Sequence, residues 1–378
     1  MMTSVTRREF LRQMAAGLGA LAGGWLLSAC GVQKMPTPTA SPPPTRIPPS
    51  PTATAGATIV PTPTAGETSV PTATASATSM PTPTAGATSM PTATVGATSV
   101  PTSTPSTGYP DLVVARGGEP EELVQRALAA LGGMERFVQP GDDVIVKPNI
   151  CVAYHTYEYA ATTNPWVVAA LVRLCLEAGA RRVRVMDYPF GGGPEEAYVR
   201  SGIQEQVVAA GGEMEIMSRF KFVAAEIPQG LDLRQCDIYD QVLNADVVIN
   251  VPIAKTHGLA RLTLGMKNLM GVISDRPAMH RNLGQRLADL TSRIRPALTV
   301  VDAVRILVAN GPTGGNLDDV KKMDTVIASP DIVAADSYAA TMFGLQPDDL
   351  SYVRAAAAMG LGRSDLDSLK IEEIAVGD

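Results

Sequence analysis

The sequence predicts an α/β domain over residues 109–378, with a mostly parallel sheet of βαβ units and helices on both faces. Three observations lead to this prediction. Short apolar runs of strand length alternate with stretches of helical periodicity. Charged or polar residues directly follow several of these runs, as at the carboxyl edge of a parallel sheet. Residues 31–108 have few large apolar side chains, so a disordered stalk is expected before the domain.

The first elements are predicted from apolar spacing and local capping signals. Residues 121–131 have helical periodicity, and residues 144–146 form a short apolar run typical of a strand. Asn164 followed by a proline is typical of a helix start, and Gly179 lies where a helix commonly ends. A helix over residues 165–178 between two parallel strands makes the expected architecture Rossmann-like.

The later part of the domain continues this alternation. Residues 259–273 carry apolar side chains at helical spacing and predict a helix. Thr263, Lys267 and Gly271 would lie on another face of that helix, because they are four residues apart. Further strands are predicted at residues 183–186, 247–249, 298–301 and 326–328, and further helices at 331–343 and 351–359.

Residues 1–30 are predicted to be an export signal. Arg7 and Arg8 lie in a twin-arginine consensus that precedes an apolar run over residues 15–29. That run is too short for a membrane-spanning helix and ends in a lipobox-like sequence at Cys30. We therefore expect recognition by the twin-arginine translocase, lipidation of Cys30, and attachment to a membrane on its extracytoplasmic side, in the periplasm or at the cell surface.

A Pro/Thr/Ser-rich linker is predicted over residues 31–108. It contains a ten-residue repeat, of which PTPTAGATSM is one copy. Frequent prolines favour extended polyproline geometry at about 3.1 Å per residue. The linker would therefore act as a spacer between the membrane and the globular domain.

Composition excludes several classes of function. The formal net charge of −6 argues against a nucleic-acid partner. Cys151, Cys175 and Cys236 lack Cys-x-x-Cys spacing, so neither an iron–sulfur cluster nor a disulfide framework is indicated. Neither G-x-G-x-x-G nor the P-loop pattern occurs, so the sequence has no nucleotide-binding fingerprint.

Lysine, histidine and asparagine side chains follow the predicted strands and indicate a site for a small anionic molecule. Unpaired charges between apolar elements are costly, so an anion is expected to compensate them. Histidines could move protons near neutral pH. The candidate catalytic residues are Lys255, His257, Lys267 and His280. The candidate ligand-binding residues are Lys147, Asn149, Thr163, Asn268, Gly271 and Gly311.

A divalent metal ion is a possible cofactor of this site. Asp187 and Asp302 follow predicted strands, and His257 could add a nitrogen ligand to their carboxylates. No metal-binding spacing such as H-E-x-x-H accompanies them. The alternatives are structural: a helix-cap or turn role for an aspartate after a strand, salt-bridged surface positions for the lysines, and a hydrogen-bonded core position for the histidine.

An ordered series of motifs resembles the family known as domain of unknown function 362. The motifs are KPN at 147–149, ATTNP at 161–165, VPIAKTH at 251–257, KNLMG at 267–271 and DIVAAD at 331–336. The resemblance covers roughly residues 111–362 and implies a fold and a motif set but no established reaction. Many relatives carry ferredoxin-like cysteine motifs, which this chain lacks. A looser similarity links its Lys/His-rich motifs to nickel-pincer lactate racemase-like proteins.

Two functions compete at this stage. The chain could be an exported, lipid-anchored enzyme that binds and transforms a small anionic ligand, with metal assistance as one option. Alternatively, it could be a non-catalytic solute- or cofactor-binding lipoprotein that uses the same pocket. A structural surface protein whose stalk carries the function is a third, less favoured hypothesis.

Overall fold

The computed structural model describes residues 108–377. The predicted signal with Arg7, Arg8 and Cys30, and nearly all of the predicted stalk, lie outside the described residues. No helix within residues 108–377 is both long and apolar enough to cross a membrane.

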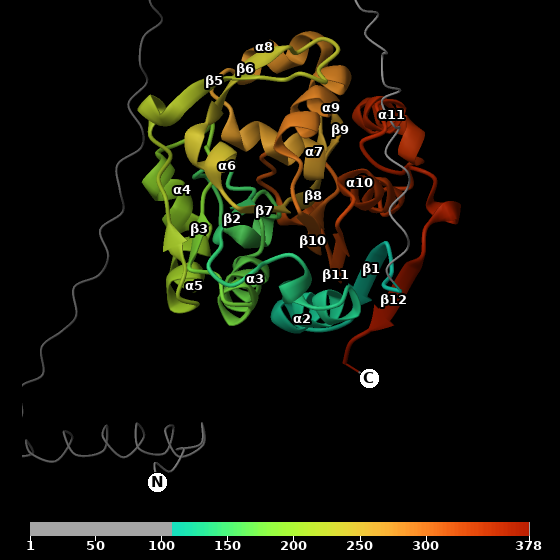
Figure 1. The fold of residues 1–378 in the computed structure, drawn as a ribbon. Helices are drawn as coiled ribbons and strands as arrows, with labels where there is room; N and C mark the ends of the chain where they lie inside the picture. Colours follow the sequence, from blue (N-terminus) through green and yellow to red (C-terminus); the bar gives the residue numbers. More distant parts are fainter. Residues whose placement is uncertain (1–107, 378) are drawn as a thin grey trace, which may run out of the picture. The chain divides into compact units, whose positions relative to one another are not determined.

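The domain is built around a ten-stranded sheet (Figure 1), with the order β12-β1-β11-β10-β7-β2-β3-β4 and with β8 and β9 off this path. Neighbouring strands are parallel except where β11 pairs with β1 and β10, and where β9 pairs with β8. The predicted mostly parallel sheet is therefore confirmed. The strands are β1 (Leu112–Arg116), β2 (Asp143–Pro148), β3 (Arg182–Val185), β4 (Glu213–Met214), β7 (Val247–Val251), β8 (Ile253–His257), β9 (Arg261–Thr263), β10 (Leu298–Leu307), β11 (Val320–Ser329) and β12 (Ile371–Ala375). A separate antiparallel pair consists of β5 (Phe222–Glu226) and β6 (Gln235–Tyr239).

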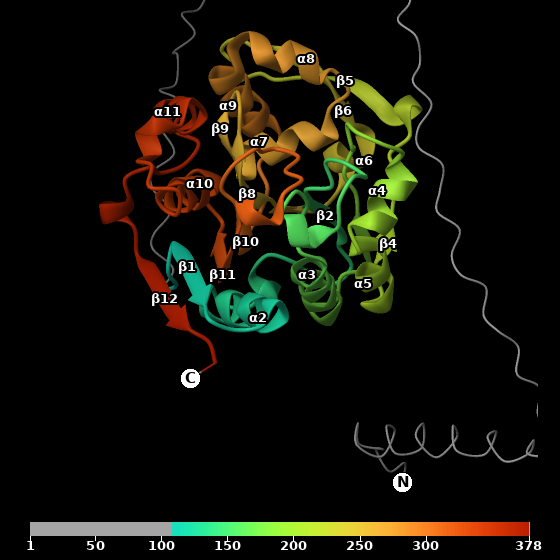
Figure 2. The ribbon, with the colours of Figure 1, turned by 180° about the vertical axis from the view of Figure 1, so that it is seen from behind.

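Helices cover both faces of the sheet, as predicted (Figures 1 and 2). On β2, Val144 and Val146 pack in one apolar cluster and Ile145 packs in the other, as alternation along a strand requires. The helices are α2 (Pro120–Ala130), α3 (Pro165–Glu177), α4 (Pro194–Arg200), α5 (Ile203–Ala209), α6 (Asp240–Asn244), α7 (Gly265–Asn268), α8 (Arg276–Met279), α9 (Leu283–Ile294), α10 (Ile332–Thr341) and α11 (Ser351–Ala358).

Local signals placed α3 correctly. The Asn164 side chain accepts a hydrogen bond from the backbone N–H of Trp166, and Pro165 occupies the first helical turn. Gly179 follows the helix with a φ of +95°, a conformation that favours glycine. Each signal lies within two residues of the helix end that it marks, so the local sequence is enough to predict where this helix begins and ends.

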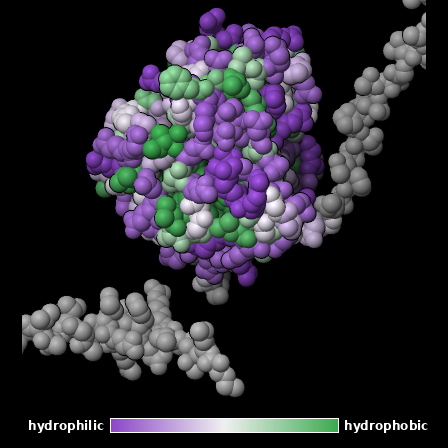
Figure 3. Space-filling view, turned by 60° about the vertical axis from the view of Figure 1, so that its left-hand side comes forward, coloured by the Kyte–Doolittle hydropathy of each residue, from purple (hydrophilic) through white to green (hydrophobic). Residues whose placement is uncertain are grey.

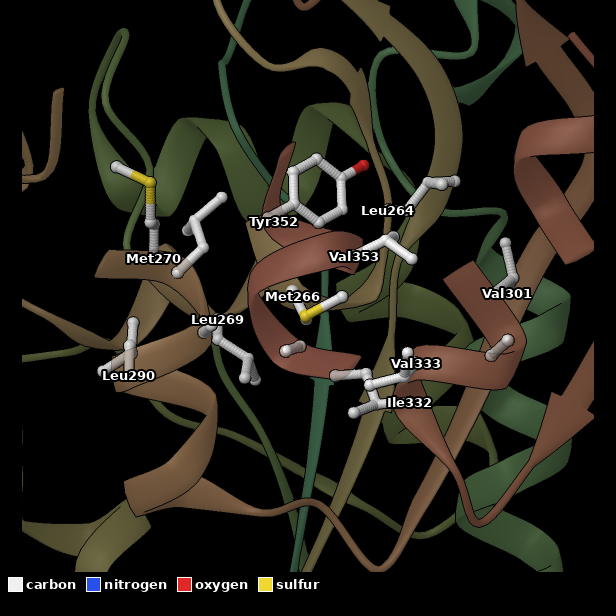
Figure 4. Close-up of a cluster of buried hydrophobic side chains, with 14 of the residues drawn as sticks. Leu264, Met266, Leu269, Met270, Leu290, Val301, Ile332, Val333, Tyr352 and Val353 are labelled. Carbon is white, nitrogen blue, oxygen red and sulfur yellow. The ribbon is translucent and has the colours of Figure 1, made fainter. Parts of the chain in front are cut away.

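The single helix predicted over residues 259–273 is wrong. The chain instead forms the β8–β9 hairpin, then the short helix α7 and a 3₁₀ turn over Leu269–Val272. Leu264 is extended between β9 and α7, which separates strand from helix. The apolar residues are nevertheless mostly buried, with Met266 and Leu269 packed between α10, α11 and α9 (Figure 4). The spacing of the apolar residues thus predicted correctly that most of them are buried, but it did not predict the backbone conformation.

The surface of the described domain carries both apolar and hydrophilic side chains. In the face drawn in Figure 3, apolar side chains are scattered among hydrophilic ones. Scattered apolar residues are normal on a protein surface and need no ligand to explain them. The chemistry-bearing residues lie instead in a cavity.

Candidate functional site

A cavity of about 890 Å³ lies beside the carboxyl ends of β2 and β3, and residues from β8, α7 and α8 complete its lining. It brings together many of the residues singled out from the sequence, and it opens at the sheet edge where ligands of parallel α/β proteins bind. The predicted site residues that line it are Asn149, Asp187, Lys255, His257, Lys267, Asn268, Gly271, His280 and Gly311.

Lys147 and Asp187 form a buried ion pair at the base of this cavity. Lys147 Nζ lies 2.7 Å from Asp187 Oδ1, and both side chains are almost fully buried. The second carboxylate oxygen, Oδ2, accepts a hydrogen bond from the backbone N–H of Ile150 at 2.6 Å. Burial lowers the pKa of Lys147, while the adjacent Asp187 opposes this effect. The carboxylate of Asp187 is therefore already hydrogen-bonded through both of its oxygens.

Two asparagines connect Lys147 to Lys255. Asn268 Oδ1 accepts hydrogen bonds from Lys147 Nζ at 3.0 Å and from Asn149 Nδ2 at 2.9 Å. Asn149 Oδ1 in turn accepts from Lys255 Nζ at 2.9 Å. Asn268 Nδ2 donates to Asn250 Oδ1, and this bond attaches the hydrogen-bond network to strand β7. The amides thus fix both ammonium groups in position.

Lys255 is fully buried without a carboxylate partner. Besides Asn149, its ammonium group donates to the carbonyl of Ala161 at 2.5 Å and lies 3.2 Å from Cys151 Sγ. Carbonyl and amide oxygens satisfy its hydrogens but do not neutralise its charge. A net positive charge therefore remains inside the domain.

Lys267 and Arg276 add further positive charge to the lining. Among the described residues, none forms a hydrogen bond or ion pair with the Lys267 ammonium group. Burial, then repulsion by Lys255 and Arg276, lowers the pKa of Lys267 from 10.5 to about 8. The Arg276 guanidinium lies 4.9 Å from the centre of the Tyr188 ring, and its Nε donates to the Met270 carbonyl. Its pKa is lowered by burial.

His257 is held as a neutral imidazole. Its Nδ1 accepts hydrogen bonds from the backbone N–H groups of Leu259 and Ala260, at 3.0 and 3.2 Å. The proton of the neutral ring is therefore on Nε2. Burial, followed by repulsion from Lys267, lowers the pKa of His257 to about 4. His257 is consequently a hydrogen-bond donor at neutral pH, because its acceptor nitrogen is occupied by the backbone.

His280 lies at the rim. It is exposed and lines the same cavity as His257. Burial and the nearby Lys267 lower its pKa, so its ring is neutral at pH 7. With solvent access and an unoccupied ring, His280 is better placed than His257 to exchange protons with water.

Gly271 and Gly311 line the cavity at positions where a side chain would not fit. A Cβ atom at Gly271 would lie 1.8 Å from Asp187 Oδ1 and 2.6 Å from Lys147 Nζ. A Cβ atom at Gly311 would lie 1.8 Å from the Thr256 carbonyl oxygen. The buried ion pair therefore lies so close to the backbone at position 271 that only glycine fits there.

Thr163 and Asp302 do not line the cavity. Thr163 Oγ1 accepts from the backbone N–H of Asn149 and donates to the Val251 carbonyl, both at 2.8 Å. Asp302 lies within β10, and its two oxygens accept backbone N–H groups, including that of Asn164 at 2.7 Å. Burial raises the pKa of Asp302 to about 6. Both residues therefore brace the loops behind the site.

The three residues suggested as metal ligands are not grouped in a way that fits a metal ion. Asp187 is occupied by Lys147 and Ile150, Asp302 faces backbone groups, and His257 Nδ1 is blocked. Within residues 108–377, no cluster of three or more His, Cys, Asp or Glu side chains is arranged to hold a metal.

Arg276 and Cys151 were missed as parts of the site. Arg276 follows Asp275 in the short helix α8, and no sequence pattern linked it to the strand edge. The Cys151 thiol lies beside Lys255 Nζ, while His155, four residues further along the chain, stacks on Tyr159 at 4.5 Å. The position of Cys151, two residues after Asn149, was the only available signal.

Comparisons with known proteins place this site in a described family. The family described as Domain of unknown function (DUF362) matches residues 144–341, which include every residue of the network above. The thylakoid-associated protein sll1697 of Synechocystis sp. is 28% identical over 249 residues, covering 62% of this chain and 73% of the relative.

A solved structure is similar at a greater distance. The lactate racemase apoprotein from Thermoanaerobacterium thermosaccharolyticum has a TM-score of 0.36 and 10% identity, over 56% of this chain and 53% of its own. The chain thus spans about half of that structure, and the likeness is too remote to support an inference about function. The family match covers more than half of the sequence, and the chain therefore belongs to the DUF362 family.

Proposed function

We propose that the domain binds a small anionic molecule in the cavity. One observation carries this proposal: Lys255, Lys267 and Arg276 face a cavity whose lining contains a single carboxylate, Asp187. That carboxylate is already paired with Lys147. Buried charges are normally compensated, so a carboxylate or phosphate group of a ligand would supply the missing negative charge.

The site residues would divide the work of recognition. Lys267 and Arg276 would contact the anion directly, and the Nε2–H of His257 would donate a hydrogen bond to it. Lys255 would act as a fixed charge behind them. The occupied Nδ1 of His257 favours a binding role for this residue and so supports the non-catalytic alternative, whereas the rim position of His280 favours proton transfer.

Binding measurements on single-charge variants test this proposal. Isothermal titration with phosphate, sulfate and lactate is expected to detect at least one ligand. Lys267→Met and Arg276→Met should each weaken it by tenfold or more, about 1.4 kcal/mol. Arg200→Met is the matched control, because Arg200 is exposed in an i,i+4 pair with Glu196. Equal affinity in all four proteins would contradict the proposal.

We also propose that the protein is exported by the twin-arginine route and anchored through lipid on Cys30. Support comes from the order of signal and lipobox in the sequence and from a relative whose name places it at thylakoids. Replacing Arg7 and Arg8 with lysine should retain the chain in the cytoplasm. Cys30→Ala should instead release it from the membrane fraction. Unchanged fractionation of both variants would contradict this proposal.

A further inference from the structure

We propose that Lys267 is a nucleophile that forms a covalent imine with the carbonyl carbon of a 2-oxo acid bound in the cavity. This inference rests on the proposed function, because the ligand carboxylate must first be held by the cationic lining. It adds a ligand class and a chemical step to the binding site.

The hydrogen-bond pattern singles out Lys267 from the other two lysines. Lys147 is consumed by its ion pair with Asp187. Lys255 donates to an amide, a carbonyl and a thiol, and its side chain is fully buried. Among the described lysines at this site, Lys267 alone has a free ammonium group, and it lines the cavity. A nucleophilic amine needs such an unoccupied nitrogen.

The neighbouring charges activate the same amine. An amine attacks a carbonyl only when it is unprotonated, and a lysine gains this form near neutral pH when burial or another cation lowers its pKa. Both causes lower the pKa of Lys267, to about 8, and Lys255 and Arg276 are the principal neighbouring cations. Arg276 would hold the carboxylate that stands next to the reacting carbonyl, with the buried charge of Lys255 behind it.

The step is balanced without an added oxidant or reductant. The neutral amine nitrogen of Lys267 forms a bond to the ligand's carbonyl carbon, and the carbonyl oxygen takes up a proton to give a carbinolamine. The hydroxyl then leaves as water after a second protonation, while the nitrogen keeps one hydrogen in the iminium ion. Starting from the ammonium form, the net change is the loss of one water. His280 at the rim is placed to exchange the protons with solvent.

The apolar part of the lining narrows the ligand class further. Phe190 and Leu259 line the cavity with 56% and 69% of their surfaces exposed, and Met270 adds a flexible apolar side chain. A cavity of about 890 Å³ is far larger than a carboxylate and a carbonyl require. These features fit a 2-oxo acid with an apolar side chain.

Reductive trapping tests the proposal on the full-length wild-type protein. The protein is incubated with 2-oxo-4-phenylbutanoate and cyanoborohydride, and peptide mass spectrometry locates the reduced adduct. We expect a single saturable adduct on Lys267. The absence of an adduct, or equal labelling of exposed lysines such as Lys322, would overturn the inference. Mapping on the wild-type protein does not depend on any variant folding.

A second ligand separates this inference from the proposed function. The alcohol 2-hydroxy-4-phenylbutanoate has the same carboxylate and side chain but no carbonyl to attack. If it binds by calorimetry while the oxo acid is not trapped, the anion site stands and the imine fails. If neither it nor phosphate, sulfate or lactate binds, both proposals fail. Lys267→Arg should lose trapping, whereas Lys322→Arg, at an exposed lysine outside the cavity, should keep both trapping and binding of the alcohol.

Discussion

At the scale of single residues, the three lysines of the site differ in their hydrogen-bond and ion-pair partners. Lys147 has a carboxylate partner, Lys255 has only neutral acceptors, and Lys267 has neither. The sequence identified all three as candidates because each is a charged residue packed between or directly after apolar elements. It did not distinguish them, because their partners Asp187, Asn149 and Asn268 come from separate segments that only the folded chain assembles.

Anion affinity is expected to depend on pH through Lys267. The anion binds the ammonium form, so the affinity for sulfate, whose charge is fixed in this range, should fall by up to tenfold per pH unit above about pH 8. The charged groups around this amine are Lys255, Arg276 and Lys147, with the Cys151 thiol nearby. Titration calorimetry across this range measures the effect.

Lys267→Arg is the control for this pH dependence. An arginine stays protonated throughout the range, so its affinity profile should be flat. The neighbouring His257 is neutral over the whole range, since its pKa is about 4, and would not imitate the effect. A decline of equal size in the arginine variant would assign the pH dependence to another group.

The close approach at Gly271 gives a steric prediction. Gly271→Ala would force its methyl group into Asp187 Oδ1 and Lys147 Nζ, which lie in a rigid, buried pair. We expect a loss of about 3 kcal/mol in the free energy of unfolding, the scale of overpacking or of breaking a buried ion pair. Chemical denaturation measures this loss. Gly193→Ala should be nearly neutral, because its added Cβ would meet no atom closer than 4.0 Å.

At the scale of elements, the segment over residues 259–273 separates what a sequence determines from what it does not. The start of α7 is fixed by Asp336, whose carboxylate accepts the backbone N–H groups of Gly265 and Met266 at 2.6 and 3.0 Å. Asp336 lies 71 positions from Gly265, so no local pattern contains this cap. By contrast, α3 is capped by its own neighbour Asn164 and was predicted to within a residue.

Removing this distant cap should damage both stability and binding. Asp336→Ala would leave two buried N–H groups without acceptors, which costs about 2–4 kcal/mol in total. It would also release α7, which carries Lys267 and Asn268, so anion affinity should fall. Denaturation and calorimetry measure the two effects. Asp365→Ala removes the cap of a 3₁₀ turn elsewhere and should leave anion affinity unchanged.

At the scale of the whole molecule, the order of apolar runs predicted the sheet and the edge where the site lies. The antiparallel direction of β11 and the hairpin of β8 and β9 were not predictable, because strand direction is set by pairing rather than by composition. The set of site residues predicted from the sequence also included residues that do not line the cavity. Asp302 and Thr163 have the right residue types but are satisfied by the backbone.

The described residues contain every side chain assigned to the anion site. A chain of residues 108–378 is therefore expected to unfold cooperatively and to bind the same anion with the affinity of the full-length protein. Calorimetry on both proteins tests this expectation. A tenfold weaker affinity in the shorter chain would mean that residues 1–107 contribute to the ligand site.

The two asparagines between the lysines have a further consequence. Asn268 Oδ1 receives two donors and Asn149 Oδ1 receives the Lys255 ammonium, so rotating either amide would set donor against donor. Each amide in this hydrogen-bond network can therefore adopt only one of its two orientations. Amides hold cations in place without discharging them, whereas aspartates at the same positions would cancel their charge. The positive charge of the site therefore remains available to a bound anion.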